Sequence, residues 1–183
     1  MARTERIDVR RNREAIVAAA RLAFRRGEFD RRFDDFAALA GVGVGTLYRH
    51  FPTRDALAAA VYRDEVDALR EDARLLLDEQ PPGAALGAFL RAFVQRIAAE
   101  PALARTLGTS MRDRPDLQAE GADTLADSIA ALVDAAAAEG RLLNDLTPGV
   151  VLTALHGIGS STDRPDWEAD AELLIAALVR ERP

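Results

Sequence analysis

The sequence predicts an all-α fold of about nine helices, and three observations support this expectation. Apolar residues recur at intervals of three and four along the chain, whereas no segment alternates apolar and polar residues over the length of a strand. Ala, Leu, Arg and Glu, which favour helices, dominate the composition. With 183 residues and 49% hydrophobic content, the chain can bury a substantial core, as one domain or as a small domain joined to a larger one.

Glycine, proline and capping residues divide the chain into these helices. Gly27 stands where a glycine ends the first helix, and the run Gly41-Val42-Gly43 is too small and flexible for a helix interior. Pro52 ends the third helix, and Thr53 is a good N-cap for the fourth. The expected helices cover residues 8–26, 34–40, 44–50, 54–78, 84–99, 101–111, 116–139, 148–160 and 167–180.

The charges of the chain are divided unevenly between its two parts. Residues 1–55 hold 12 Arg and 8 acidic residues, whereas residues 56–183 hold 12 Arg and 22 acidic residues. A basic amino-terminal module on an acidic body is expected if only that module meets the phosphates of a nucleic acid. An ordinary solvated surface would explain the same division equally well.

Composition also excludes several kinds of site. The chain has no cysteine, which excludes disulfides, thiolate nucleophiles and cysteine-built zinc sites, and its two histidines, His50 and His156, do not suggest a metal site. No cofactor is implied. The sequence has no run of eighteen apolar residues, and its Arg-rich start lacks the apolar region of a signal peptide. We therefore expect a soluble, cytoplasmic protein without a membrane partner.

An enzyme is the alternative from a different class of function, and the sequence gives it little support. His156 precedes Ser160 by one helical turn, so the two side chains could meet. However, no nucleophile elbow, phosphate-binding loop or pair of carboxylates with a base accompanies them. We therefore do not expect an enzyme.

Two short helices separated by a glycine turn, residues 34–40 and 44–50, form the pattern of a helix-turn-helix. The spacing of their apolar residues predicts a shared core made of Phe36, Leu39, Val42 and Leu47, with Phe24 and Phe51. The other positions of the second helix then face outward. Gly45 would let the backbone approach a DNA groove, and Thr46 can offer a hydroxyl or a methyl group to a base edge.

The remaining outward side chains suit the phosphates of DNA. Tyr48 and His50 are hydrogen-bond donors for phosphate oxygens, while Arg49 and Arg54 add positive charge. Packing beneath the fourth helix is the structural alternative for Tyr48 and His50. Val44 fits a DNA contact and a half-buried packing position equally well.

These residues resemble a known family. Arg13-Glu-Ala-Ile16, Ala19-Ala20, Phe24, Gly27 and the run Ala40-Gly-Val-Gly-Val-Gly-Thr-Leu-Tyr-Arg-His-Phe-Pro-Thr-Arg-Asp-Ala-Leu57 are similar to the amino-terminal domain of TetR/AcrR-type regulators. The match covers roughly the first third of the chain. The family's DNA contacts carry over onto Gly43, Gly45, Thr46, Tyr48, Arg49, His50 and Arg54.

The resemblance implies a helix-turn-helix DNA-binding domain, residues 1–53, joined to a helical effector-binding and dimerisation domain, residues 54–183. It implies a ligand-responsive repressor that binds double-stranded DNA, a palindromic operator, as a homodimer and responds to a small-molecule effector. A helical ligand-binding or interaction protein that kept the fold without operator binding is the alternative.

One residue departs from the family pattern. The family often has Thr or Ser at the position of Phe33, where the hydroxyl caps the second helix and touches phosphate. Phe33 can do neither, so Arg32 or a nearby aspartate is the candidate substitute. Arg31 and Arg32 could also supply a phosphate contact, and a solvated loop is equally compatible with them.

The carboxy-terminal helices carry apolar faces that fit either a core or a binding surface. For the aromatic residues core packing is the alternative to ligand binding, and for Arg96 it is an ion pair with a neighbouring carboxylate. For the last two helices the alternative to a dimer interface is the core of the single chain. Candidate ligand-binding residues are Phe89, Phe93, Arg96, Met111 and His156, and candidate interface residues are Val151, Leu155, Ile158, Leu174 and Leu178.

Overall fold

The computed structural model describes residues 2–81, 83–142 and 146–179. Within these ranges the protein is all-α, as predicted, and it adds one isolated β-bridge between Leu142 and Val179. The nine helices found there are α1 (Ala2–Arg25), α2 (Asp35–Leu39), α3 (Val44–His50), α4 (Arg54–Glu79), α5 (Ala85–Ala99), α6 (Pro101–Met111), α7 (Pro115–Ala138), α8 (Pro148–Ser160) and α9 (Trp167–Leu178).

The helix bounds follow the punctuation of the sequence, with one exception. From α2 to α9 each helix begins and ends within two residues of its predicted bounds; residue 180, the predicted end of the last helix, lies outside the described residues. The predicted start of α1 at Asp8 is wrong, since this helix begins at Ala2. Residues 2–7 contain Ala, Arg and Glu without a glycine or proline, so their helix propensity outweighs their polarity.

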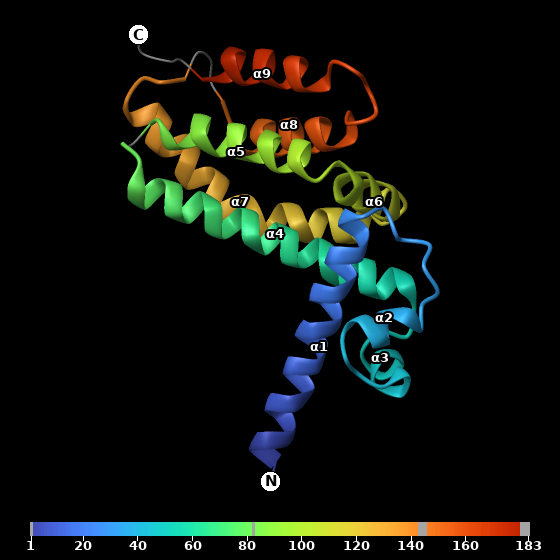
Figure 1. Ribbon diagram of the computed structural model, residues 1–183. Helices are drawn as coiled ribbons and strands as arrows, with labels where there is room; N and C mark the ends of the chain where they lie inside the picture. Colours follow the sequence, from blue (N-terminus) through green and yellow to red (C-terminus); the bar gives the residue numbers. More distant parts are fainter. Residues whose placement is uncertain (1, 82, 143–145, 180–183) are drawn as a thin grey trace.

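The buried side chains form two hydrophobic clusters that share α4. The amino-terminal cluster lies among α1, α2, α3, α6 and the first parts of α4 and α7, whereas the larger cluster joins the rest of α4 and α7 to α5, α8 and α9. Tyr62 of α4 packs against both clusters. Figure 1 shows α4 and α7 side by side, with α1 to α3 at one end of this pair and α5, α8 and α9 stacked along it.

Two glycines set the turns that shape the amino-terminal domain. Gly27 and Gly41 follow α1 and α2 with φ of 73° and 67°, where a side chain would be strained. After α2, the N–H of Gly41 donates to the carbonyl of Ala38, and the N–H of Val42 donates to that of Ala37. This pair of hydrogen bonds closes the helix and directs the chain into α3.

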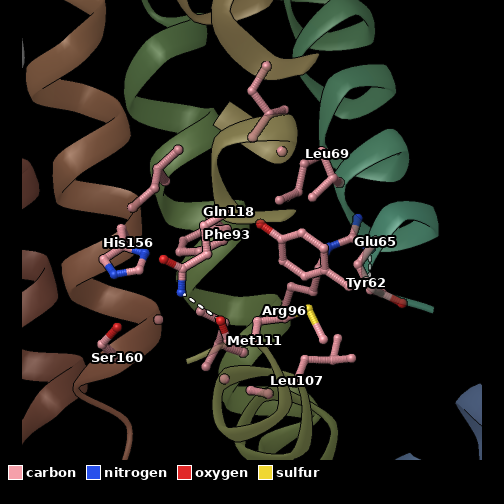
Figure 2. A pocket seen from close by; sticks show the side chains of 18 of the residues that line it. Tyr62, Glu65, Leu69, Phe93, Arg96, Leu107, Met111, Gln118, His156 and Ser160 are labelled. Atoms are coloured by element: carbon pink, nitrogen blue, oxygen red, sulfur yellow. Dashed lines mark hydrogen bonds and ion pairs between the residues drawn. The ribbon is translucent and has the colours of Figure 1, made fainter. Parts of the chain in front are cut away.

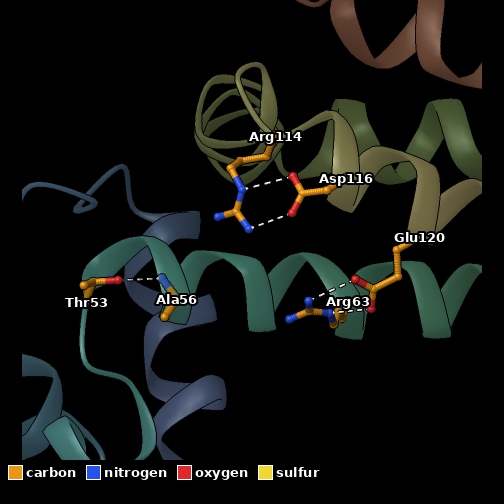
Figure 3. A network of polar contacts seen from close by, with 6 residues as sticks. All are labelled: Thr53, Ala56, Arg63, Arg114, Asp116 and Glu120. Atoms are coloured by element: carbon orange, nitrogen blue, oxygen red, sulfur yellow. Dashed lines mark hydrogen bonds and ion pairs between the residues drawn. The ribbon is translucent and has the colours of Figure 1, made fainter.

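The start of α4 is capped as predicted. The Oγ1 atom of Thr53 accepts a hydrogen bond from the N–H of Ala56 at 3.1 Å, as Figure 3 shows. This contact fixes the point at which the chain leaves the short α3 and enters the long helix that runs into the carboxy-terminal bundle.

Two kinds of feature are missing from the parts of the chain that the structure describes. None of their helices is both long and apolar enough to cross a membrane. Nowhere in these ranges do three or more histidine or carboxylate side chains gather as they would around a metal ion.

Candidate functional site

The packing of α2 against α3 leaves one face of α3 exposed. Phe36 and Leu47 are fully buried, and the ring of Phe36 meets that of Phe24 edge-on, with 5.9 Å between centroids. The predicted core position of Leu39 is wrong, since this side chain is 46% exposed, and Val42 is only half-buried. The five-residue α2 buries Phe36 and Ala37 against α1 and α3 and leaves Leu39 on its outer side.

The predicted DNA contacts of α3 gather on this exposed face. Val44 and Tyr48 are exposed to 45% and 46%, which places two large apolar groups in solvent on one short helix. Burial within the chain therefore does not explain them. Of the other predicted contacts, Gly43, Gly45 and Arg49 are exposed, and Thr46 and His50 are half-buried.

Gly45 has no structural reason to be a glycine. Its φ is not in the left-handed region, and a Cβ built on it would have no described atom within 4 Å. Gly43 is similar, since its Cβ would meet only the Oγ1 atom of Thr46, at 4.0 Å. The bare backbone at the start of α3 thus leaves space on the outside of the molecule.

The position of Phe33 shows how the departure from the family pattern is accommodated. The ring of Phe33 packs edge-on against that of Tyr48, with 5.3 Å between centroids. The Tyr48 hydroxyl donates to Oδ1 of Asp34 at 2.9 Å, and this hydrogen bond to a carboxylate raises the pKa of the Tyr48 phenol. Asp34 occupies the N-cap position of α2, but within the described structure its carboxylate accepts from Tyr48 instead of capping the helix.

His50 and Arg54 are both half-buried at the edge of this face. Burial, together with the positive charges of Arg13 and Arg49, lowers the pKa of His50. Arg54 is half-buried, and its guanidinium donates to the backbone carbonyls of Phe29 and Arg31. It also lies over the Phe29 ring. Arg54 therefore holds the loop between α1 and α2 in place.

The second candidate site is a cavity of about 260 Å³ among α4, α5, α6, α7 and α8. Its wall is mostly apolar, and a few polar groups from different helices converge on it, which is typical of a small-molecule site. Figure 2 shows Tyr62 and Glu65 of α4 on one side of the cavity and His156 and Ser160 of α8 on the other. The amide nitrogen of Gln118, on α7, donates to the carbonyl of Met111 at 3.1 Å.

Four of the five predicted ligand-binding residues line this cavity: Phe93, Arg96, Met111 and His156. Phe89 does not, because its side chain is 1% exposed within the larger hydrophobic cluster. The two phenylalanines are four residues apart on α5, and only the packing of the bundle distinguishes their environments.

One cavity residue, Glu65, could have been identified from the sequence, but the sequence analysis did not single it out. Leu57, Val61 and Leu69 lie on the apolar side of α4 at intervals of one and two turns, and Glu65 occupies the missing position in this series. A carboxylate inside an apolar stripe indicates a buried partner or a ligand. Tyr62 and Gln118 have no comparable signal, since their positions depend on how α4 crosses α7.

The comparisons with known proteins cover both parts of the chain. Residues 15–61 match the family model "Bacterial regulatory proteins, tetR family", and residues 81–180 match "Transcriptional regulator SbtR-like, C-terminal domain". A crystal structure of a TetR transcriptional regulator from Streptomyces coelicolor, SCO0520, is 36% identical. This match covers 93% of the present chain and 99% of that chain, with a TM-score of 0.65.

The chain belongs to the TetR family.

Further relatives agree with this assignment. A TetR transcription regulatory protein from Mycobacterium vanbaalenii is 30% identical, with a TM-score of 0.66, and the match covers 95% of the present chain and 98% of that one. The HTH-type transcriptional regulator SAR0097 of Staphylococcus aureus (strain MRSA252) is 35% identical over 69 residues. This segment is 37% of the present chain and spans about a third, 36%, of that curated relative. The protein is therefore a DNA-binding transcriptional regulator of a non-enzymatic family.

The single chain of this TetR-family regulator buries three of the five residues predicted for the dimer interface. Val151, Leu155 and Ile158 are at most 5% exposed, because this face of α8 packs into the larger hydrophobic cluster. Leu178 is partly buried against the same cluster, and Leu174 is 37% exposed. Since α8 is apolar on most sides, its sequence could not indicate which face the single chain buries.

Proposed function

We propose that this TetR-family regulator is a ligand-responsive repressor that binds a palindromic operator as a homodimer. In this proposal residues 1–53 bind DNA, and residues 54–183 bind the effector and form the dimer. The observation that carries the proposal is the face of α3, where the side chains of Val44 and Tyr48 are exposed beside the bare backbone of Gly45, a position that the fold does not require to be glycine. A short helix of this kind fits the major groove of DNA.

The charge of the amino-terminal part supports the same role. Arg49 is exposed on α3, and residues 1–55 carry four more arginines than acidic residues. In this proposal the imidazole of His50 donates to a phosphate oxygen, and the Tyr48 hydroxyl exchanges its hydrogen bond to Asp34 for one to phosphate. Phosphate contacts of this type would make operator binding weaken as the salt concentration rises.

A dimer is supported by apolar side chains that the single chain leaves in solvent. Val150 of α8 and Leu173 of α9 are 46% and 71% exposed, and Leu174 lies beside the latter. We expect Leu173→Glu to shift the protein toward monomer in light scattering. Leu75→Glu, at an exposed leucine of α4, is the matched control and should leave the dimer intact.

Binding to DNA fragments from upstream of the regulator's own gene tests the main proposal. We expect sequence-selective, salt-sensitive binding. Arg49→Gln should weaken this binding. It should also reduce the slope of log affinity against log salt concentration by about one for each arginine replaced. Arg74→Gln, at an exposed arginine of α4, removes the same charge outside α3 and should have little effect. Absence of selective binding by the wild-type protein would contradict the proposal.

Effector control is tested separately on the cavity. A metabolite that binds the wild-type protein should raise its melting temperature and weaken operator binding, because binding to one conformation shifts the equilibrium between conformations. Substituting the cavity residue Phe93 should reduce the melting-temperature shift. Failure of every tested ligand to change operator affinity would contradict ligand control while leaving DNA binding intact.

A further inference from the structure

Two ion pairs join α1 of the DNA-binding domain to the wall of the cavity. The Nε atom of Arg21 lies 2.5 Å from Oε1 of Glu65, and the guanidinium of Arg25 contacts both carboxylate oxygens of Glu100 at 2.6 and 2.7 Å. The two arginines are one turn apart on the same side of α1. Both carboxylates line the cavity, whereas neither arginine does. The cavity wall is thus connected directly to a helix of the DNA-binding domain.

The charged side chains that line the cavity include more carboxylates than guanidinium groups. Among the described residues of its lining, the carboxylates are Glu65 and Glu100, and the guanidinium is that of Arg96. Arg96 makes its short contact with Asp72, which lies outside the lining, and its contact with Glu65 is longer, at 3.6 Å. The shortest ion pairs of the two carboxylates are therefore those with the arginines of α1.

The pair between Arg21 and Glu65 is close but poorly aligned. The side chain of Glu65 is 12% exposed, yet its Oε1 atom and Nε of Arg21 make no hydrogen bond with any described residue. Burial raises the pKa of the Glu65 carboxyl despite the nearby arginines. The Oε1 atom of Glu65 can therefore accept a hydrogen bond from a positive donor group within the cavity.

The apolar part of the wall suits the body of such a ligand. Tyr62 and Phe93 contribute aromatic rings to the same cavity, and aromatic faces attract organic cations. The side chains of Leu69 and Leu107 provide apolar surface nearby, as Figure 2 shows. The lining thus combines two carboxylates with a predominantly apolar volume.

We propose that the cavity binds a small amphipathic organic cation, whose positive group replaces Arg21 and Arg25 on Glu65 and Glu100 and thereby releases α1. The proposal rests on the function proposed above. It adds the class of ligand and the ion pairs through which the ligand acts on α1. Because α1 packs against α2 and α3, its release changes the position of the DNA-binding face. An anionic ligand would pair with Arg96 and leave both ion pairs of α1 in place.

Three probes with one chain length and different head groups test the ligand class: decylammonium, decanoate and decanol, each far below its micellar concentration. Calorimetric titration of the full-length protein should give a dissociation constant for decylammonium at least tenfold below that for decanoate. Equal binding of the two ions, or tighter binding of decanoate, would overturn the proposal. Decanol reports the contribution of the apolar chain alone.

Two substitutions with opposite expected effects test the exchange itself. Glu100→Gln should weaken decylammonium binding about tenfold, whereas Arg25→Gln should strengthen it several-fold, because it removes the competing cation. A merely structural role would make both variants weaker or leave both unchanged, and either result would overturn the exchange. Both side chains are partly exposed, which favours folding of the variants.

The ion pair between Arg63 and Glu120 provides the matched control. It has the same two-point geometry, with distances of 2.6 and 2.9 Å, but joins α4 to α7 outside the cavity, as Figure 3 shows. Glu120→Gln and Arg63→Gln should leave decylammonium binding within twofold of the wild type. A reduction equal to that of Glu100→Gln would show that the effect is not specific to the cavity, and it would overturn the proposal.

Release of α1 is measured with and without DNA, so that the two proposals can fail separately. Decylammonium, but not decanoate, should accelerate amide hydrogen exchange in residues 8–25 and weaken operator binding at least tenfold. If the wild-type protein binds no operator, the proposed function fails, while the titration and exchange measurements still decide the ligand class and the release of α1. Unchanged exchange in residues 8–25 on saturation with decylammonium would overturn the release.

Discussion

Replacing Gly45 with alanine separates the stability of α3 from its contact with DNA. Gly45 is the second residue of α3, its φ lies outside the left-handed region, and a Cβ there would have no described atom within 4 Å. The methyl group of Gly45→Ala can therefore be added without a clash inside the protein. On the outside, it would occupy space that we assign to the DNA groove.

Gly45→Ala should raise the folding stability of the protein and lower its affinity for the operator. Alanine is more favourable than glycine in a helix by about 0.5–1 kcal/mol, so folding should become slightly more stable. This change corresponds to a rise in melting temperature of roughly 1–4 °C for a protein of this size. Forcing a methyl group into a packed interface costs about 1–3 kcal/mol. Over the two half-sites of a dimer, the lower end of this range corresponds to about 30-fold weaker operator binding.

Thermal unfolding and fluorescence anisotropy with labelled operator measure the two effects on the same protein sample. Gly149→Ala is the matched control, because Gly149 is also the second residue of its helix, α8, and its nearest described neighbour to a Cβ is 3.9 Å away. This variant should gain similar stability and bind the operator like the wild type. A Gly45→Ala protein that is stabilised and binds the operator with unchanged affinity would refute the close approach of α3 to DNA. A destabilised Gly45→Ala protein would refute the structural argument.

Three further predictions concern other parts of the chain. Gly121→Ala should destabilise the fold by about 1–3 kcal/mol, since its Cβ would lie 2.5 Å from the Tyr62 hydroxyl, and chemical denaturation measures the change. Arg54→Met should cost about 2 kcal/mol in the same assay, because two backbone carbonyls lose a charged donor. Operator affinity should rise as the pH falls from 8 to 6, because burial and neighbouring arginines lower the pKa of His50 in the free protein whereas a bound phosphate would raise it, so that DNA binding takes up a proton. His50→Gln should flatten this dependence.

Each of these predictions has a result that would contradict it. Gly108→Ala, which adds a Cβ with no described atom within 4 Å, should not reproduce the destabilisation caused by Gly121→Ala. Arg54→Lys should restore part of the stability that Arg54→Met removes; equal stability of Arg54→Met and the wild type would make the loop contacts unimportant. A pH dependence of operator binding that survives in His50→Gln would assign the titration to another group.

The amino-terminal domain could be predicted closely because its structure depends on local chemistry. Gly41 permits a backbone conformation that other residues avoid, and Thr53 caps α4 through its own side chain, so each position can be recognised from neighbours in the chain. The exposure of Leu39 could not be recognised in this way, because it depends on how little of α2 reaches α1.

The sequence by itself determined the all-α fold, most helix bounds, the family resemblance and the residues of α3 that we assign to DNA. These properties follow from helical periodicity, turn chemistry and a specific run of residues. Only the tertiary structure decided that Phe93 lines the cavity while Phe89 is buried, and that α8 turns Val151 inward and Val150 outward. It also brought Arg25 of α1 to Glu100, 75 residues away. Periodicity identifies the faces of a helix, but the partner of each face depends on contacts between segments distant in the chain.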